Sequence, residues 1–519
     1  MKSGSARTPW RSTKKCWDRD KAPAEPQKRR RGLVVLFLKK KHILTQREAR
    51  RARAPCVCVW GTIMLEKNQL HMVTIQGYSS EGAGVARVGG QVVFIRGALD
   101  GEACRIKILK AGKTAAFGKV EAVLEASSHR VTPACPVFQK CGGCDLLHMD
   151  YTEELAMKRR RVQDAVARIG GLDIKVGEIL GAENIHSYRN KAIYAVGVEN
   201  GRPVIGFYRT RSHQIVPAAS CAIQSPAGEK AAGALLTWMN ACQVSPYHEA
   251  DGTGLIRRLF VRHGFETGQT GICIVAAGSR LPKQTELVAA LREADPTITS
   301  IVLNVNKNRG NTVLQGDFHT LWGEAYVEDI LCGLRFRLSP KSFYQVNRAQ
   351  AERLYEKVME YADLTGKETV LDLYCGTGTI TLCLARRAGL AIGAEISKEA
   401  IEDAKENAAW NQIENVRFLC ADAGEAAKKL DEEGLRPRVV VVDPPRKGLD
   451  APVVETIAGM EPDRLVYVSC DPATLARDLK RFTEMGYAPE RVTPVDMFPR
   501  CAHVETVVLL QRQAHKAVL

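Results

Sequence analysis

Short apolar runs and amphipathic segments alternate along the C-terminal half of the chain. The apolar runs, each of four to six residues, lie at 369–374, 390–395, 416–420, 439–443 and 465–468. Runs that are apolar throughout are typical of parallel strands covered on both faces, and helical segments between them indicate βαβ units. The pattern therefore predicts an α/β fold over residues 336–519, with a doubly wound sheet.

A different pattern, of short alternating strands separated by glycines, occupies residues 64–126. Alternation is clearest at 91–95 and 103–109. Evenly spaced short strands with glycine turns predict a small closed β-barrel of the OB type. Such barrels commonly bind single-stranded nucleic acid through a basic face. The Arg and Lys side chains of this segment fit that role, and they fit equally well the solvated surface of a purely structural barrel.

The residues between these two parts, 127–335, have a mixed pattern. Residues 151–169 read as an amphipathic helix ended by Gly170 and Gly171, and a second helix is expected near 283–293. Strand-like runs occur at 272–275 and 301–305. We expect a mixed α/β domain, whose topology the pattern leaves open.

The positive charge of the chain is concentrated in its first 63 residues. Of the net charge of +16, this segment holds 18 Lys and Arg against 4 Asp and Glu, which leaves 56 against 54, or +2, for the remainder. It is typical of a disordered basic tail, with a nucleic-acid-binding arm or a transit peptide as alternatives. Translation that starts at Met64, which would make the segment spurious, is the interpretation we favour. No apolar run reaches the ~18 residues of a membrane span.

The 16 cysteines of the chain, with no secretory signal, favour a reducing, cytoplasmic compartment and metal-binding or catalytic roles. Cys135, Cys141 and Cys144 form a C-x5-C-x2-C run whose paired glycines allow the loop to fold back. The best candidate for a fourth ligand is Cys221. Four thiolates suit either Zn²⁺ or an iron–sulfur cluster, and the spacing alone does not choose between them.

Carboxylates and glycines recur where the apolar runs of the C-terminal part end. Cys375-Gly-Thr-Gly follows the first run, and Glu395 ends the second, 23 residues after Asp372. Asp422 and Asp443 follow the third and fourth runs. Glycines at a strand-to-helix turn let a ligand approach the backbone closely. An acidic residue at the end of the next strand can accept hydrogen bonds from ribose hydroxyls. The series predicts a nucleoside-like cofactor at this edge of the sheet.

The set LDLYCGTG, GAE and VDPP resembles class I S-adenosylmethionine-dependent methyltransferases. Neither an aromatic residue nor a cysteine follows the Asp443-Pro-Pro motif, and the available thiol is Cys470, after the fifth run. Methylation of uracil C5 suits this arrangement, because a thiolate must add to C6 before C5 becomes nucleophilic. A base must then remove the C5 proton, and Glu505 is our candidate, with His503 as a rival. A core position for the Cys470 thiol is the alternative.

From about Met64 to Leu510 the chain resembles the RNA (uracil-5-)-methyltransferase family, in its large-subunit ribosomal RNA branch. The matching stretches are the glycine-rich barrel, similar to a TRAM domain, and CPVFQKCGGC, SYRNK, FYQVN, LDLYCGTGTI, DPPRKG, YVSCDPATLARD and HVETV. The resemblance implies Cys470 as nucleophile and Glu505 as proton acceptor. It also implies S-adenosylmethionine contacts from Gln345, Tyr374, Glu395 and Asp443, and a [4Fe-4S] cluster on Cys135, Cys141, Cys144 and Cys221.

The expected function is transfer of a methyl group to C5 of uridines in 23S ribosomal RNA. The same chemistry on transfer RNA is one alternative, and an iron–sulfur RNA-binding or assembly factor without catalysis is another. The expected partner is ribosomal RNA, with no membrane and no obligate protein partner, and the protein is expected to be a monomer. The expected division is a tail at 1–63, a TRAM barrel at 64–126, a central cluster-containing domain at 127–335 and a methyltransferase domain at 336–519.

Overall fold

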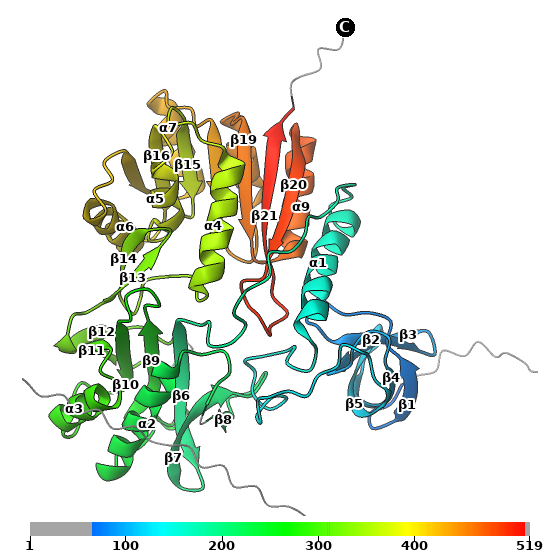
Figure 1. Cartoon of the computed structure of the whole chain (residues 1–519), viewed down its shortest axis with the longest axis vertical. Coiled ribbons are helices and arrows are strands. Elements are labelled where there is room, and N and C mark those ends of the chain that lie inside the picture. Colours follow the sequence, from blue (N-terminus) through cyan, green and yellow to red (C-terminus); the bar gives the residue numbers. More distant parts are fainter. Residues whose placement is uncertain (1–64, 219, 309, 311, 514–519) are drawn as a thin grey trace, which may run out of the picture. The chain divides into compact units, whose positions relative to one another are not determined.

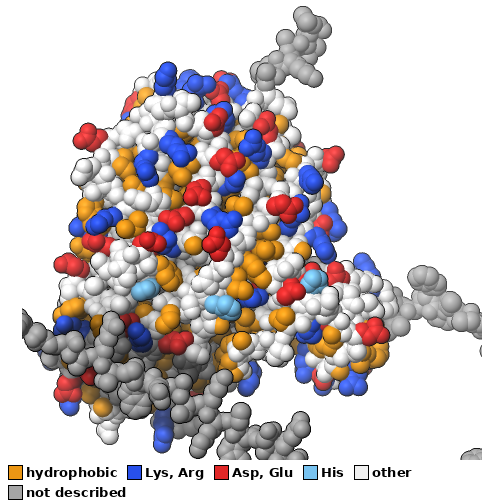
Figure 2. Space-filling model, in the orientation of Figure 1, with side chains coloured by type: hydrophobic (Ala, Val, Ile, Leu, Met, Phe, Trp, Pro, Cys, Tyr) orange, Lys and Arg blue, Asp and Glu red, His pale blue; other side chains and the backbone are white. Residues whose placement is uncertain are grey.

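The computed structural model describes residues 65–218, 220–308, 310 and 312–513 (Figure 1). The expectations for residues 1–63 and for a start at Met64 lie outside the described residues. The described residues all belong to one compact unit. In the part of this unit that is described, no helix combines the length and apolar character needed to cross a bilayer. On the face drawn in Figure 2, acidic and basic side chains are interspersed, in keeping with the near-neutral balance outside the first 63 residues.

The first part of this unit is a small five-stranded barrel. Its strands are β1 (Leu70–Thr74), β2 (Gly84–Val88), β3 (Gln91–Arg96), β4 (Ala103–Ala111) and β5 (Ala115–Glu125). The sheet order is β1-β4-β5-β3-β2, and the chain just after β1 closes it onto β2, where the Val85 amide donates to the Gly77 carbonyl (2.9 Å). The expected strands at 91–95 and 103–109 are confirmed as β3 and β4, which bury alternate apolar side chains in the barrel core.

A long helix and a seven-stranded sheet make up the middle of the chain. The helix α1 (Tyr151–Arg168) confirms the predicted amphipathic helix at 151–169. The strands are β6 (Lys191–Glu199), β7 (Arg202–Tyr208), β8 (Ile215–Pro217), β9 (Ile256–His263), β10 (Thr270–Ala276), β11 (Ile298–Val305) and β12 (Asp317–Gly323). Their order is β12-β11-β10-β9-β6-β7-β8, and α2 (Pro226–Ala241) and α3 (Gln284–Ala294) share its largest apolar core.

A hairpin, β13 (Val327–Leu331) and β14 (Leu334–Leu338), leads into the C-terminal sheet. Its apolar side chains lie in the same core as the helix α4 (Arg348–Ala362), although the expected boundary at 335/336 falls within β14. The division into domains stays a prediction.

The C-terminal part is a seven-stranded sheet with helices on both faces (Figure 1). Its further elements are β15 (Thr369–Leu373), α5 (Thr379–Ala385), β16 (Leu390–Glu395), α6 (Lys398–Trp410), β17 (Val416–Cys420), α7 (Ala423–Glu432), β18 (Val439–Val442), α8 (Ala451–Gly459), β19 (Arg464–Ser469), α9 (Pro472–Glu484), β20 (Tyr487–Val495) and β21 (Glu505–Arg512). The five predicted apolar runs are confirmed as β15–β19, each within one residue at both ends.

Alternate residues of these strands enter two different cores. On β18, Val439 and Val441 pack in a core with α4 and α5, whereas Val440 and Val442 pack in a core with α7, α8 and α9. Helix α1 joins the second core through Val162 and Val166. A strand buried on both faces has no polar positions, which explains why the runs read as apolar throughout.

The sheet order, β17-β16-β15-β18-β19-β21-β20, places five parallel strands beside an antiparallel pair. Because β21 runs antiparallel to β19, its first residue lies next to the carboxyl ends of the parallel strands. The predicted site residues that follow or end these strands therefore gather at this one end of the sheet.

Candidate active site

Cys470 and Glu505 occupy the same end of neighbouring strands. The last paired residues of β19 and β21 are Ser469 and Thr506, so Cys470 and Glu505 come next on either side. Cys470 is half-buried and Glu505 is 4% exposed. The structure brings together the thiol and the carboxylate that the sequence placed 35 residues apart.

The turn at Cys470 is held by the start of α9. The Asp471 carboxylate accepts from the backbone amides of Ala473 (2.9 Å) and Thr474 (3.0 Å), and Pro472 takes the first helical position. The Ser469 hydroxyl accepts from the Asp471 amide (3.2 Å). These contacts satisfy backbone donors at the start of α9, and Pro472 suits the first helical position. The sequence Ser-Cys-Asp-Pro thus fixes the position of the thiol through its neighbours.

Burial sets the protonation of this site. It raises the pKa of Glu505 to about 8, with the nearby Asp443 adding to the rise and Arg446 opposing it. It also raises the pKa of the Cys470 thiol to about 11, with help from Glu505 and Asp443 and again against Arg446. Burial alone raises the pKa of Asp443 to about 7. Carboxyls with pKa values raised toward neutrality are typical of sites that exchange protons.

Asp478, to which the sequence analysis gave no role, fixes the Asp443-Pro-Pro-Arg-Lys-Gly loop. Its buried carboxylate accepts from the Leu449 amide (2.8 Å) and from the Tyr467 hydroxyl (2.8 Å). At Gly448, which has a φ of +71°, an added Cβ would come within 2.4 Å of this carboxylate. The sequence signal was available, since Asp478 lies among the apolar, core-facing positions of α9.

The loop between β15 and α5 and the end of β16 form a cradle of backbone amides and one carboxylate. Glu395 accepts from the amides of Gly376 (3.3 Å) and Ser397 (2.9 Å), so the two strand ends are joined. Beneath the loop, Asp372 accepts from the Thr381 hydroxyl (2.6 Å), and burial raises its pKa to about 7. Tyr374 begins the loop with a φ of +69°. This geometry suits a nucleoside cofactor, as expected from the sequence.

The two sequence stretches SYRNK and FYQVN lie side by side. The Asn190 side chain donates to the Gln345 carbonyl (2.8 Å), and its amide donates to the Val346 carbonyl (2.8 Å). Near this cradle two large apolar side chains are exposed, Phe343 at 64% and Ile396 at 75%. Sequence reasoning missed both, because an apolar residue carries no mark of exposure.

The four cysteines of the predicted cluster line one cavity of about 250 Å³. Cys135, Cys141 and Cys144 approach it from one loop and Cys221 from another. The loop is held by the Gly142 amide, which donates to the Tyr208 carbonyl (3.0 Å). Among the residues that the structure describes, no three His, Cys, Asp or Glu side chains lie close enough together to hold a metal ion.

The donor set of this cavity nevertheless fits an iron–sulfur cluster. Burial raises the pKa of the Cys141, Cys144 and Cys221 thiols, so they would need a bound cation to become thiolates at neutral pH. The Gly143 amide donates to the Cys141 sulfur (3.3 Å), a contact that stabilises thiolate ligands. Arg189 and Lys191 also line the cavity and would offset the negative charge of a thiolate-bound cluster.

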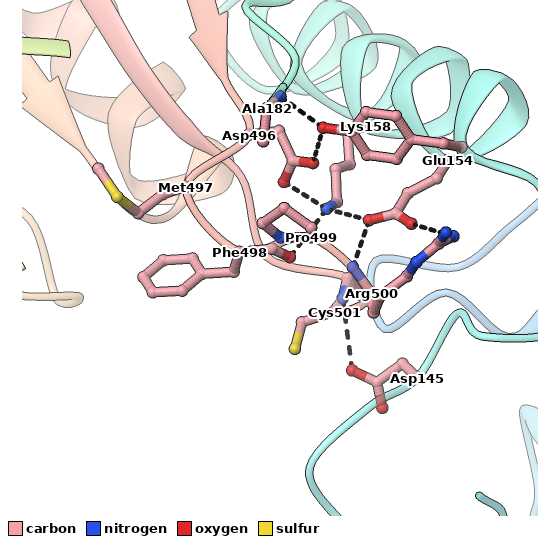
Figure 3. A network of polar contacts seen from close by, with 12 residues as sticks. Asp145, Glu154, Lys158, Ala182, Asp496, Met497, Phe498, Pro499, Arg500 and Cys501 are labelled. Atoms are coloured by element: carbon pink, nitrogen blue, oxygen red, sulfur yellow. Dashed lines mark hydrogen bonds and ion pairs between the residues drawn. The ribbon is translucent and has the colours of Figure 1, made fainter. Parts of the chain in front are cut away.

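A buried charge network ties helix α1 to the segment before Glu505 (Figure 3). The Lys158 ammonium on α1 donates to Asp496 (2.6 Å) and to Glu154 (2.7 Å), and all three side chains are buried. Burial lowers the pKa of Lys158, but the two carboxylates outweigh it and hold the pKa above its ordinary value. Glu154 also accepts from the Arg500 amide (2.7 Å). The segment 496–504 is therefore anchored on α1.

The same segment is bound directly by the cysteine loop. The amides of Asp145 and Leu146 donate to the Arg500 carbonyl (2.9 and 3.1 Å). The Cys501 thiol donates to the Gly143 carbonyl (3.2 Å), and the Asp145 carboxylate accepts from the Ala502 amide (3.3 Å). The loop that carries three of the four cavity cysteines thus contacts the chain three residues before Glu505.

The doubly wound sheet, the amide cradle and the strand-end carboxylates together define a class I methyltransferase domain, preceded by a TRAM-type barrel. Two family models match the chain: tRNA (Uracil-5-)-methyltransferase over residues 327–513 and TRAM domain over residues 66–120. The chain belongs to the RNA (uracil-5-)-methyltransferase family and carries its TRAM domain. It is an S-adenosylmethionine-dependent enzyme that methylates uracil C5 in RNA.

Relatives match over almost their whole length. An uncharacterized RNA methyltransferase of Clostridium tetani is 43% identical over 86% of this chain and 97% of its own. One from Caldanaerobacter subterraneus subsp. tengcongensis is 43% identical over 85% of this chain and 97% of its own. Among solved structures, the Pyrococcus abyssi tRNA (uracil-54, C5)-methyltransferase in complex with S-adenosyl-L-homocysteine is 25% identical, with a TM-score of 0.69, over 85% of this chain and all of that one.

Proposed function

We propose that this enzyme methylates C5 of specific uridines in 23S ribosomal RNA, with Cys470 as the nucleophile and Glu505 as the base. The supporting observation is the position of the two side chains next to each other at the ends of β19 and β21. A thiol and a carboxylate on adjacent strand ends are what addition to uracil C6 and proton removal from C5 require.

The proposed reaction balances as follows. The Cys470 thiol gives up its proton to water, and its sulfur bonds to C6, which turns C5 into an enolate carbon. C5 takes the methyl group that S-adenosylmethionine supplies, and S-adenosylhomocysteine leaves. Glu505 then accepts the C5 proton, the C6–sulfur bond breaks and the thiolate departs. Glu505 must be in its carboxylate form for this transfer, and a pKa of about 8 then makes it a stronger base than an ordinary carboxylate.

We assign the cofactor contacts to Gln345, Tyr374, Glu395 and Asp443. Glu395, at the end of β16, would accept hydrogen bonds from the ribose hydroxyls of the cofactor. Asp443 follows β18 and Tyr374 follows β15, on either side of the cradle. Exposed Ile396, directly after Glu395, would cover the base of the cofactor and lose its exposure on binding. His503 is the rival base, but burial together with Arg446 and Arg161 lowers its pKa, which weakens it as a proton acceptor.

We further propose that Cys135, Cys141, Cys144 and Cys221 hold a [4Fe-4S] cluster. Their common cavity, the amide contact to the Cys141 sulfur and the lining cations support this assignment. When bound, such a cluster would join the cysteine loop to the loop of Cys221. Its expected effect is on the fold, because it lies in the central part of the chain, 127–335.

We propose 23S ribosomal RNA as the target because the cysteine motif resembles that of the family's ribosomal RNA branch. Transfer RNA is a second candidate, favoured by the likeness to the Pyrococcus abyssi enzyme, which acts on transfer RNA. Mass mapping of 5-methyluridine in both RNA classes separates them, in a strain that lacks this protein and in the same strain carrying the wild-type or the Cys470→Ala protein. Loss from 23S RNA that only the wild type restores is the expected result. Loss from transfer RNA alone would overturn the ribosomal assignment.

A further inference from the structure

Three consecutive arginines on α1 differ in their partners. Arg159 pairs with Glu178 (2.8 Å) and Arg160 with Asp100 (3.2 Å). For Arg161, the described residues offer no carboxylate within 4.0 Å, and its guanidinium donates to the Ala502 carbonyl (2.7 Å). A guanidinium has five N–H donors, so most of those on this half-buried side chain are left for a ligand.

Two further basic groups lie beside Arg161. Arg446, in the loop after β18, places its guanidinium 3.4 Å from the His503 ring, and His503 follows the Ala502 that Arg161 contacts. Within the part of the chain that is described, Arg446 also has no carboxylate within ion-pair distance. Burial lowers the pKa of Arg161; the charge of Asp471 opposes this, the charge of Arg446 adds to it, and Glu81 opposes it more weakly. Two guanidinium groups, those of Arg161 and Arg446, thus lie at this corner without an ion-pair partner among the described residues.

The corner adjoins the proposed catalytic pair. Arg446 lies close enough to Cys470 and Glu505 to lower the pKa of both. A nucleotide whose uracil reaches the Cys470 sulfur must bring its own ribose and phosphates to the same edge of the sheet. An arginine fork matches a phosphate in two parallel hydrogen bonds, and phosphate contacts fix the position of a nucleic acid without reading its sequence.

We propose that Arg161, Arg446 and His503 form a binding site for a backbone phosphate next to the target uridine. The three groups come from α1, from the loop after β18 and from the segment before β21, so the site exists only when these elements are packed together. Of the three arginines on α1, Arg161 is the one that we place in this site. This inference rests on the proposed function for the identity of the bound nucleotide, but the binding of phosphate to the corner can be measured without methyl transfer.

The test compares Arg161→Gln with Arg159→Gln. The control residue lies on the same helix and, like Arg161, donates to a backbone carbonyl, that of Val176 (3.1 Å), but it has a carboxylate partner. The measurement is the affinity of the full chain for a uridine-containing RNA hairpin over a series of salt concentrations, by fluorescence anisotropy. For Arg161→Gln we expect binding about tenfold weaker and a salt dependence about one phosphate contact shallower. Arg161→Lys should restore most of the affinity.

Other sources of the anion give different results. If the arginine holds the carboxylate of S-adenosylmethionine instead, Arg161→Gln weakens cofactor binding in calorimetry and leaves the salt dependence of RNA binding unchanged, which overturns the proposal. Equal losses in Arg159→Gln and Arg161→Gln overturn it as well, because they mark a general charge effect. Inorganic phosphate should compete with the hairpin more strongly in wild type than in Arg161→Gln, and equal competition contradicts the site.

Two checks separate folding and function from this result. The thermal unfolding of Arg161→Gln should match that of wild type, and if it does not, the Arg161→Lys variant carries the comparison. If the hairpin is bound with the expected salt dependence while 5-methyluridine is absent from all RNA, the phosphate site stands and the proposed function fails. If methylation occurs but the salt dependence is the same in all variants, the phosphate site fails and the proposed function stands.

Discussion

The two cysteine sites of this protein are positioned in different ways. Cys470 stands at the end of a buried strand, where the register of β19 and β21 and the capped start of α9 hold it. The four cavity cysteines come from loops, and they surround a cavity without reaching metal-binding distances in the described structure. The first site is fixed by the fold, whereas the second would be completed by the cluster that we propose for it.

This contrast has a physical basis. A strand end inherits the precision of the hydrogen-bonded sheet, and a catalytic group must be held to a fraction of an ångström. A cluster contributes its own bonds, so its loops need only bring the thiols near. The two sites still share one element, since the cysteine loop binds the segment 496–504 that leads to Glu505.

The largest expected effect comes from the strand-end thiol. Cys470→Ala should lower methyl transfer by more than about 10³-fold, because it removes the sulfur that we propose bonds to C6. Binding of RNA and of S-adenosylmethionine should be unchanged, since the turn is held by Ser469 and Asp471. Single-turnover assays with labelled cofactor measure methyl transfer, and calorimetry measures the binding of RNA and of S-adenosylmethionine. Turnover within tenfold of wild type would remove Cys470 from the mechanism.

The next effect concerns the cavity. Cys221→Ser should lower the expected content of about four iron and four sulfide per chain, since it removes one of the four proposed thiolate ligands. It should also lower the thermal unfolding temperature by several degrees. Iron and sulfide analysis, absorbance near the visible range and calorimetry measure these changes.

Cys242→Ser is the matched control, because Cys242 is half-buried as Cys221 is but does not line the cavity. Zinc in place of iron in protein purified without oxygen would contradict the cluster assignment. If Cys221→Ser retains full iron content, Cys221 is not a ligand.

A smaller effect concerns stability and pH at the strand-end site. The folded-state pKa of Glu505, about 8, lies above its ordinary value of 4.5. Between these values the folded chain keeps a proton that the unfolded chain releases, so this group costs stability as pH rises from about 5 to 8. Glu505→Gln should therefore raise the free energy of unfolding by about 1–3 kcal/mol at pH 8 and by little at pH 5. Urea unfolding at the two pH values measures the difference, and a gain that does not depend on pH would contradict the raised pKa.

Much of the strand-end site could be predicted, because its evidence is local. The runs that become β15–β19 and the turn Ser-Cys-Asp-Pro can be read from neighbouring residues, and they place the Cys470 thiol within one residue. To place Glu505 beside Cys470, the prediction needed only one further assumption, that the last apolar run pairs with β19. The amphipathic helix α1 was equally clear from its pattern.

Other features depend on residues far apart in sequence and were not foreseen. The pairing of β6 with β9 turns two separate segments into one sheet, and α2 and β20 were missed altogether. Lys158 reads as a solvent-facing residue of a basic helix, yet it is buried between Glu154 and Asp496. The sequence of the three consecutive arginines likewise does not reveal that each has a different partner. Such features arise from tertiary packing, which no local pattern records.

The most direct test of the central claim is to trap the proposed adduct and locate it. Glu505→Gln protein, incubated with target RNA and S-adenosylmethionine, should form a complex that survives denaturing gels, because the C5 proton of the methylated adduct cannot be removed. After digestion, mass spectrometry should find a methylated uridine joined to the peptide that contains Cys470. The Cys470→Ala/Glu505→Gln double variant should give no complex. A nucleotide joined to any other cysteine, or no adduct with undiminished turnover, would contradict the account.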